Sequence, residues 1–221
     1  MIYAITGDVL QILNVVFDKG DEFIACADAM TYMTDGVTME AKASSIRGIQ
    51  TVVSKRTEHM AIFKSKEEGG RIGLGGSLPG KIVELNISDS GWVFQMSALI
   101  GFEKTVETET IIQKKISSMQ FSHSGLVLQS LEGSGMAFIS ACGDHYTVEL
   151  KEGERYNIST INALAWESGV KFEISTAPGL KTAAFGAESI YITTLTGPGK
   201  IVIQSMNPGL SAAIVSSFLP K

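Results

Sequence analysis

Three glutamates stand at matching places in three similar stretches of the sequence. Glu40, Glu109 and Glu173 each follow a central valine by three residues. If the stretches are copies of one unit, the carboxylates occupy equivalent positions and would form an acidic ring in an assembly, able to bind a cation or a partner. The interpretation that we favour is simpler: each is a solvated strand residue, or accepts hydrogen bonds from a turn.

Two aromatic residues, Tyr32 and Trp166, are aligned in the same stretches. Aromatic side chains dominate both protein cores and protein interfaces. We therefore favour packing in the core or in an interface for both, with a small-molecule pocket as the alternative. Together with the three glutamates, these residues are the candidate binding or interface positions of the chain.

Residue patterns that carry catalysis are scarce. The two cysteines, Cys26 and Cys142, lie far apart and form no C-x-x-C pair, which predicts buried free thiols rather than a disulfide framework or a zinc site. No G-x-S-x-G nucleophile motif occurs. The glycine-rich stretch 70–76 lacks the Gly-Lys-Ser/Thr ending of a phosphate loop. We therefore expect a non-enzymatic protein with no catalytic residue and no cofactor.

Composition indicates a folded protein and argues against a general nucleic-acid binder. The chain has 221 residues, of which 44% are hydrophobic and 19% charged, and its formal net charge is −5. A chain of this length can bury a real core, whereas binders of nucleic acid usually carry a basic excess. The basic residues gather within 42–71 and do not recur in register elsewhere. We do not expect RNA binding.

Targeting signals are not evident in the sequence. The first residues lack the basic and apolar regions of a signal peptide. No run approaches the roughly 20 apolar residues that span a bilayer. The expectation is a soluble, cytoplasmic protein.

The pattern of apolar residues predicts an all-β fold. Short stretches rich in valine, isoleucine, threonine and aromatic residues, such as 81–87, 146–150 and 200–204, alternate with turn residues. The turn segments 18–21 and 151–154 supply glycine where a positive φ is needed. Helix is expected only at 44–56 and 209–219.

The three similar stretches belong to a longer internal repeat. Each is entered by a strand, a glycine turn and an aromatic residue (Phe23, Trp92 or Tyr156), and each is left by two apolar strands around a glycine. This order predicts three tandem units, at 1–79, 80–143 and 144–221, the last with a C-terminal tail. A small β unit is marginal alone, so we expect one rigid body with pseudo-threefold character.

Several segments of the chain resemble a known family. They include Asn162–Trp166 before Gly169-Val170, the run Gly179–Gly186, Thr196–Gly199, Gln204-Ser205 and Asn207-Pro208. Together they resemble the TRAP-like family (tryptophan RNA-binding attenuation protein-like) of uncharacterised bacterial and archaeal proteins, which are related to the fungal "altered inheritance of mitochondria" proteins. The resemblance covers essentially the whole chain and is weakest in the first unit.

The resemblance implies a fold and an assembly. The three units would each be a short variant of the double-stranded β-helix, of β-sandwich type, and would exchange strands. Three chains would form a trimer whose nine units close a ring. No catalytic activity is established for the family, so no catalytic residue is transferred to this chain. A closed ring also removes exposed sheet edges.

Two alternatives accompany this interpretation. A cupin-type small-molecule or metal-dependent enzyme would need metal ligands, but His59, His123 and His145 form no H-x-H pair, and we expect no metal site. A peripheral membrane-organising protein would use the apolar segments 177–187 and 209–219, for which we favour oligomer contact instead. The favoured function is therefore a homo-oligomeric ring, a trimer, that serves as a scaffold or binding platform for an unknown partner.

Overall fold

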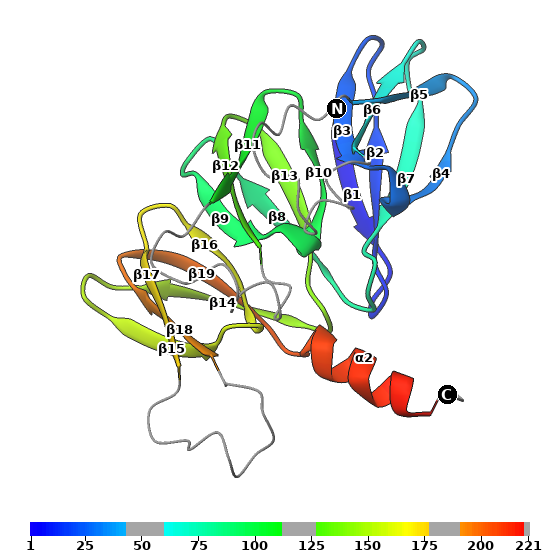
Figure 1. Cartoon of the computed structure of the whole chain (residues 1–221). Coiled ribbons are helices and arrows are strands. Elements are labelled where there is room, and N and C mark those ends of the chain that lie inside the picture. Colours follow the sequence, from blue (N-terminus) through cyan, green and yellow to red (C-terminus); the bar gives the residue numbers. More distant parts are fainter. Residues whose placement is uncertain (43–59, 112–126, 177–190, 219–221) are drawn as a thin grey trace.

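The computed structural model describes residues 1–42, 60–111, 127–176 and 191–218 of the chain. Most of these residues form strands, and neighbouring strands in the four sheets are antiparallel (Figure 1). The all-β prediction is confirmed.

The elements follow one another in a regular order. The strands within 1–79 are β1 (Ile2–Thr6), β2 (Ile12–Val16), β3 (Glu22–Cys26), β4 (Met30–Met33), β5 (Val37–Ala41), β6 (Met60–Ser65) and β7 (Arg71–Gly75). Those within 80–143 are β8 (Ile82–Asn86), β9 (Trp92–Gln95), β10 (Leu99–Glu103), β11 (Val106–Ile111), β12 (Leu128–Gly133) and β13 (Met136–Ser140). The remainder holds β14 (His145–Leu150), β15 (Arg155–Ser159), β16 (Ala163–Glu167), β17 (Lys171–Thr176), β18 (Tyr191–Thr196), β19 (Gly199–Gln204) and the helix α2 (Pro208–Ser217). Short 3-10 turns, η1 (Ala27–Ala29) and η3 (Met96–Ala98), precede β4 and β10.

The two central sheets share one plan. The first sheet has the order β1-β2-β7-β4, the second β5-β6-β3-β10-β13-β8, the third β11-β12-β9-β16-β19-β14 and the fourth β15-β18-β17. The second sheet joins strands from either side of residue 79 through β3 and β10, and the third joins strands from either side of residue 143 through β9 and β16. The predicted boundaries therefore do not separate sheets, and the division into three repeated units stays a prediction.

Glycine turns connect strands where the sequence places them. In the turn 18–21, Gly20 has a φ of 89°, and the Asp21 N–H donates to the Asp18 carbonyl at 3.1 Å. In the turn 151–154, Gly153 has a φ of 74°, and the Glu154 N–H donates to the Lys151 carbonyl at 3.0 Å. A side chain at such a φ would be strained, so both glycines are required by the backbone.

Two apolar clusters form the interior. The larger contains side chains of the first, second and third sheets, among them Phe17, Phe23, Phe63 and Phe138. The second lies between the third and fourth sheets and contains Trp166. Because the central sheets are covered on both faces, β9 is buried throughout and β10 at all residues but its last, without the alternation of a half-exposed strand.

Tyr3 fixes β1, the first strand of the chain, to the rest of the molecule. β1 pairs with β2 over five residues, from Ile2 opposite Val16 to Thr6 opposite Ile12. The Tyr3 ring packs on Phe138 with 4.9 Å between ring centroids, and its hydroxyl donates to Glu103 Oε1 at 2.6 Å. Burial and this bond raise the pKa of the Tyr3 hydroxyl.

Removing that hydroxyl should destabilise the protein. We expect Tyr3→Phe to lower the free energy of unfolding by about 1–3 kcal/mol, because the Glu103 carboxylate loses a charge-assisted hydrogen bond. Urea denaturation measures the change. Tyr146→Phe is the matched control, since Tyr146 is an exposed tyrosine of β14, and its loss should stay within about 0.5 kcal/mol. Equal midpoints for the two variants would contradict a role for Tyr3 in holding β1.

One helix closes the described chain. α2 begins at Pro208, where proline suits the first helical position, and the Asn207 side-chain oxygen accepts from the Leu210 N–H at 3.0 Å. The predicted C-terminal helix is thus confirmed, whereas the helix expected at 44–56 falls outside the described residues. Within the described ranges, no helix has the length and apolar character needed to cross a membrane.

Candidate assembly interface

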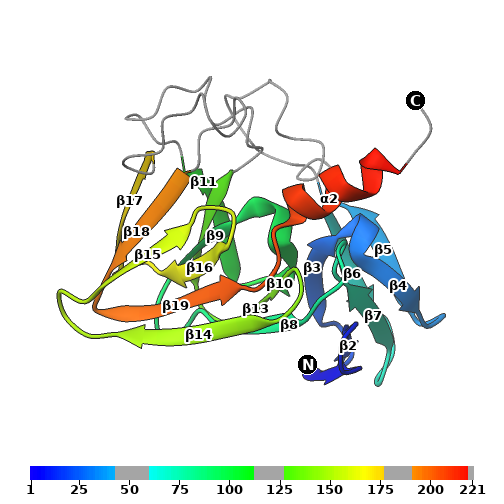
Figure 2. The same ribbon diagram turned by 90° about the horizontal axis from the view of Figure 1, so that it is seen from below.

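β4 and β15 are end strands of their sheets, whereas the corresponding strands of the two central sheets have further strands beyond them. The first sheet stops at β4 and the fourth at β15. In the central sheets the places of β4 are taken by β10 and β16, and the places of β15 by β3 and β9. In the second sheet β10 pairs with β3, and in the third sheet β16 pairs with β9. We call these two strand pairs the central junctions. Figures 1 and 2 show β4 and β15 at opposite ends of the molecule.

The two central junctions have the same register. In the second sheet Phe102 of β10 lies opposite Ile24 of β3, and in the third sheet Trp166 of β16 lies opposite Val93 of β9. At each junction the strand from the later segment, β10 or β16, also pairs with a second neighbour, β13 or β19. That second pairing contains a one-residue register shift. β4 has the same shift, so the three shifts fall between Met30 and Tyr32, Leu99 and Gly101, and Ala163 and Ala165. β4 is therefore shaped like the strands that complete a junction.

Burial separates β4 from its two counterparts. All residues of β10 and β16 are buried except the last of each, which is partly buried. In β4, by contrast, Met30, Tyr32 and Met33 are 36%, 39% and 44% exposed. A strand edge that carries large apolar side chains is a ready site for pairing with another chain.

β15 is the complementary open edge. Ile24 of β3 and Val93 of β9 are buried, while Asn157 holds the corresponding place in β15 and is exposed. The Thr160 N–H donates to the Tyr191 carbonyl on the β18 side. Since antiparallel strands alternate their hydrogen-bonding sides, the backbone groups of Asn157 face outward.

The same alternation orients β4. The Thr34 N–H donates to the Arg71 carbonyl at 3.0 Å, on the β7 side. The backbone groups of Met33 therefore face outward. Met33 corresponds to Phe102 and Trp166, and Asn157 to their partners across the junctions.

Charges flank the first junction and both open edges. In the second sheet Glu22 accepts from Lys104 at 2.6 Å across the junction, and it also accepts from Lys64. These two ammonium groups, Lys104 foremost, lower the pKa of Glu22 to about 2. By register, Arg155 of β15 corresponds to Glu22, and Asp35, which follows β4, corresponds to Lys104. Both Arg155 and Asp35 are exposed.

Tyr32 and Trp166 do not occupy matching positions. The first residues after the register shifts are Tyr32, Gly101 and Ala165, so Tyr32 corresponds to Ala165. The alignment by sequence was one residue off, because it matched Ala29 with Ala163, whereas the strand pairing places Met30 there. The Tyr32 ring lies over Gly73, where a Cβ would come within 2.1 Å of it, and its hydroxyl donates to Asn14 at 2.6 Å.

Trp166 lies in the core between the third and fourth sheets. Its side chain is only 1% exposed, and its ring centroid is 5.0 Å from that of Phe172. Its Nε1 is buried with no hydrogen-bond partner. Trp166 therefore acts in packing and is not part of an open edge.

The three glutamates occupy matching register positions but are not brought together. Glu40, Glu109 and Glu173 lie on β5, β11 and β17, each the outermost strand of a different sheet. All three are exposed. Charged residues on edge strands discourage unwanted pairing with other chains, which fits the simpler interpretation.

Metal-binding residues do not gather in the described part of the chain. No group of three or more histidine, cysteine, aspartate or glutamate side chains is placed there to hold a metal. His59 and His123 lie outside the described ranges, as do most of the segments 42–71 and 177–187. His145 opens β14, and its backbone N–H donates to the Asp144 carboxylate at 2.8 Å.

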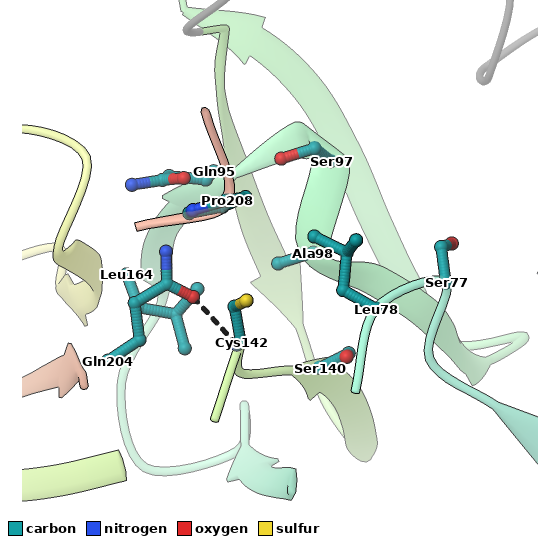
Figure 3. Close-up of a pocket in the computed structure, with 10 residues that line it drawn as sticks. All are labelled: Ser77, Leu78, Gln95, Ser97, Ala98, Ser140, Cys142, Leu164, Gln204 and Pro208. Atoms are coloured by element: carbon teal, nitrogen blue, oxygen red, sulfur yellow. Dashed lines mark hydrogen bonds between the residues drawn. The ribbon is translucent and has the colours of Figure 1, made fainter. Parts of the chain in front are cut away.

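A small pocket is lined by residues of all three predicted units, among them Leu78, Gln95 and Gln204 (Figure 3). Gln95 donates to the Ala163 carbonyl at 2.9 Å, and the Gln204 side-chain oxygen accepts from the Cys142 N–H at 2.9 Å. The cavity of about 30 Å³ holds about one water molecule. Both cysteines are buried and outside any disulfide, as predicted, and burial raises the pKa of the Cys142 thiol. The side chains of Gln95 and Gln204 therefore connect backbone segments through hydrogen bonds.

Comparison with known proteins agrees with this architecture. A family model described as "Mitochondrial biogenesis AIM24" matches residues 3–206. An uncharacterised protein of Streptococcus pyogenes serotype M6 is 22% identical over 217 residues, which cover 95% of this chain and 87% of that protein. A crystal structure of another Streptococcus pyogenes protein has a TM-score of 0.79 at 20% identity, covering 98% of this chain and 99% of that one.

These matches fix the family and the fold. The solved structure has the same fold, and the relative has no assigned role. Since the family model spans most of the sequence, the chain belongs to the mitochondrial biogenesis AIM24 family.

Proposed function

We propose that copies of this chain join head to tail, through β15 of one copy and β4 of the next, into a closed ring of three that serves as a scaffold or binding platform. One observation carries the proposal: the chain already makes this type of junction twice within itself, at β3–β10 and β9–β16. β4 at one end of the molecule and β15 at the other would each supply one strand of a third junction.

The internal junctions give the register of the external one. Inside the chain, Ile24 lies opposite Phe102 and Val93 lies opposite Trp166. By the same register, Asn157 would lie opposite Met33 of the next copy. Both have outward-facing backbone groups, so they would form a hydrogen-bonded pair with about 5.5 Å between Cα atoms. The fourth sheet would then continue into the first sheet of the neighbour.

Charge complementarity supports the same register. Two residues along, Arg155 would meet Asp35 of the next copy, as Glu22 meets Lys104 inside the chain. The polarity is reversed, but the pair is again opposite in sign. Pairing would also cover Met30, Tyr32 and Met33, and each free edge would gain a partner.

A head-to-tail contact generates a ring when its rotation closes and a filament when it does not. We propose closure at three copies, in agreement with the TRAP-like resemblance, with each chain contributing three repeated units. Such a ring presents each surface feature of the chain three times, and repeated presentation increases the avidity for a multivalent partner. The proposed role is therefore binding and organisation rather than catalysis.

A cross-linking experiment tests the contact. A chain with Met33→Cys and Asn157→Cys should be joined to other chains by a short bis-maleimide, in a ladder that ends at three. The native cysteines are buried and should contribute little. The matched control combines Met33→Cys with Glu173→Cys, which lies on the exposed outer strand β17, and should give no ladder. Absence of cross-links would reject the contact, and a ladder without an end would reject the closed ring.

A further inference from the structure

We propose that the outer edge of β14 is a binding site for an extended peptide segment of a partner protein, which adds to the third sheet as an antiparallel strand. The proposal does not depend on the ring, because it concerns a different edge of the molecule. Three strands hold corresponding places in their sheets: β8 and β14, which end theirs, and β2, which is followed outward by β1.

The chain itself shows what such an edge can bind. β2 carries β1 on its outer side, paired over five residues without a register shift. β1 precedes β2 in the first predicted unit and has no counterpart on β8 or β14, which end their sheets. The β1–β2 pair is therefore an internal example of an added strand, the binding mode called β-augmentation.

β8 is partly occupied, and this distinguishes it from β14. The Gln11 side-chain oxygen accepts from the Ile82 N–H at 2.8 Å, and the Gln11 N–H approaches the Gly80 carbonyl. The connection between β1 and β2 thus covers the beginning of β8. Ile82 and Val83 are also buried, so β8 offers little room for a further strand.

β14 presents a regular and open edge. It pairs with β19 over all six residues, from His145 to Leu150, without a shift. The His145 N–H is used by the Asp144 carboxylate, so the outward-facing backbone groups beyond it are those of Thr147 and Glu149. In the part of the chain that the structure describes, no strand pairs with this side of β14.

Side chains along β14 indicate the chemistry of the partner. Tyr146 is 64% exposed, and Val148 on the same face is partly buried. Glu149 is exposed on the other face. An added strand would therefore favour apolar residues opposite Tyr146 and Val148, and a lysine or arginine opposite Glu149, because cross-strand neighbours of this kind stabilise each other.

The register of β1 makes the proposal specific. Asn14 of β2 lies opposite Gly73 of β7, and Thr147 of β14 lies opposite Val202 of β19, at matching places in the two sheets. Ala4 lies opposite Asn14. A peptide that binds β14 as β1 binds β2 would place its Ala4 opposite Thr147, with the Ala4 backbone groups facing the protein.

The test uses a capped synthetic peptide with the sequence of residues 1–7. Hydrogen exchange followed by NMR should show slower exchange at the Thr147 and Glu149 amides as the peptide saturates. A peptide N-methylated at Ala4 should bind at least about tenfold more weakly, a loss of about 1.4 kcal/mol. The same peptide N-methylated at Ile5, whose N–H faces away, is the matched control and should bind like the parent.

A protein variant gives a second readout. Thr147→Pro should abolish peptide binding while β14 stays paired with β19, since the lost N–H faces outward and proline is tolerated at such positions of edge strands. Thr147→Val keeps the N–H and should bind normally. No saturable binding, equal binding of the two N-methylated peptides, or protection only at β4, β8 or β15 would each overturn the proposal.

Discussion

Met33→Pro should convert the proposed ring of three into single chains. Proline removes the outward N–H of Met33, and its ring blocks a strand that approaches from that side. The pairing of β4 with β7 is retained, because the neighbouring Thr34 supplies the bond to Arg71. Native mass spectrometry should therefore change from a species of three chains to one of a single chain.

The control for this variant is Met33→Val. Valine keeps the backbone donor and favours a strand conformation, so the assembly should persist with the mass of three chains. Circular dichroism should show the same β content for both variants, since neither touches a bond within the chain. A Met33→Pro protein that keeps its assembled mass would remove β4 from the interface.

Trp166→Ala should cause the largest loss of stability among single substitutions considered for this chain. Trp166 is fully buried between the third and fourth sheets against Phe172. Truncating a buried aromatic residue leaves a cavity and costs about 3–5 kcal/mol. Urea denaturation of the variant, at a fixed protein concentration, measures the decrease.

Trp166→Phe separates packing from hydrogen bonding. Because Trp166 Nε1 has no partner, phenylalanine removes no hydrogen bond and leaves only a smaller cavity. Phe102 holds the corresponding place in β10, so the position accepts this ring. We expect a loss well below that of Trp166→Ala. A similar loss for both would show that the indole nitrogen contributes in a way that its surroundings do not reveal.

Local features of the molecule could be predicted from the sequence. The alternation of apolar residues and the glycine turns gave the strands, the uncharged tail gave α2, and the isolated cysteines were expected to be buried. The register of Glu40, Glu109 and Glu173 was also foreseeable, because each follows its valine by a fixed number of residues. These features depend on residues close in sequence.

The arrangement of the strands could not be predicted in the same way. That Ile24 pairs with Phe102 depends on contacts across most of two segments, and no local pattern records it. The register shift beside Tyr32 is invisible in composition, and only the strand pairing shows that Met33, rather than Tyr32, corresponds to Trp166. One signal was available: the β1 segment precedes the strand and glycine turn that enter the first repeat, and the other repeats have no such segment, which marks an additional strand.

The sharing of strands between segments has a consequence for synthesis on the ribosome. β3 leaves the ribosome early, but its partner β10 follows much later, as does β13, the last strand of the same sheet in chain order. Until Ser140 has emerged, the second sheet cannot be completed, and the nascent chain keeps the apolar edge of β3 uncovered. Proteins dominated by such long-range pairing fold slowly and expose aggregation-prone edges meanwhile. Cellular production of this protein should therefore depend on chaperones that shield nascent β-strands.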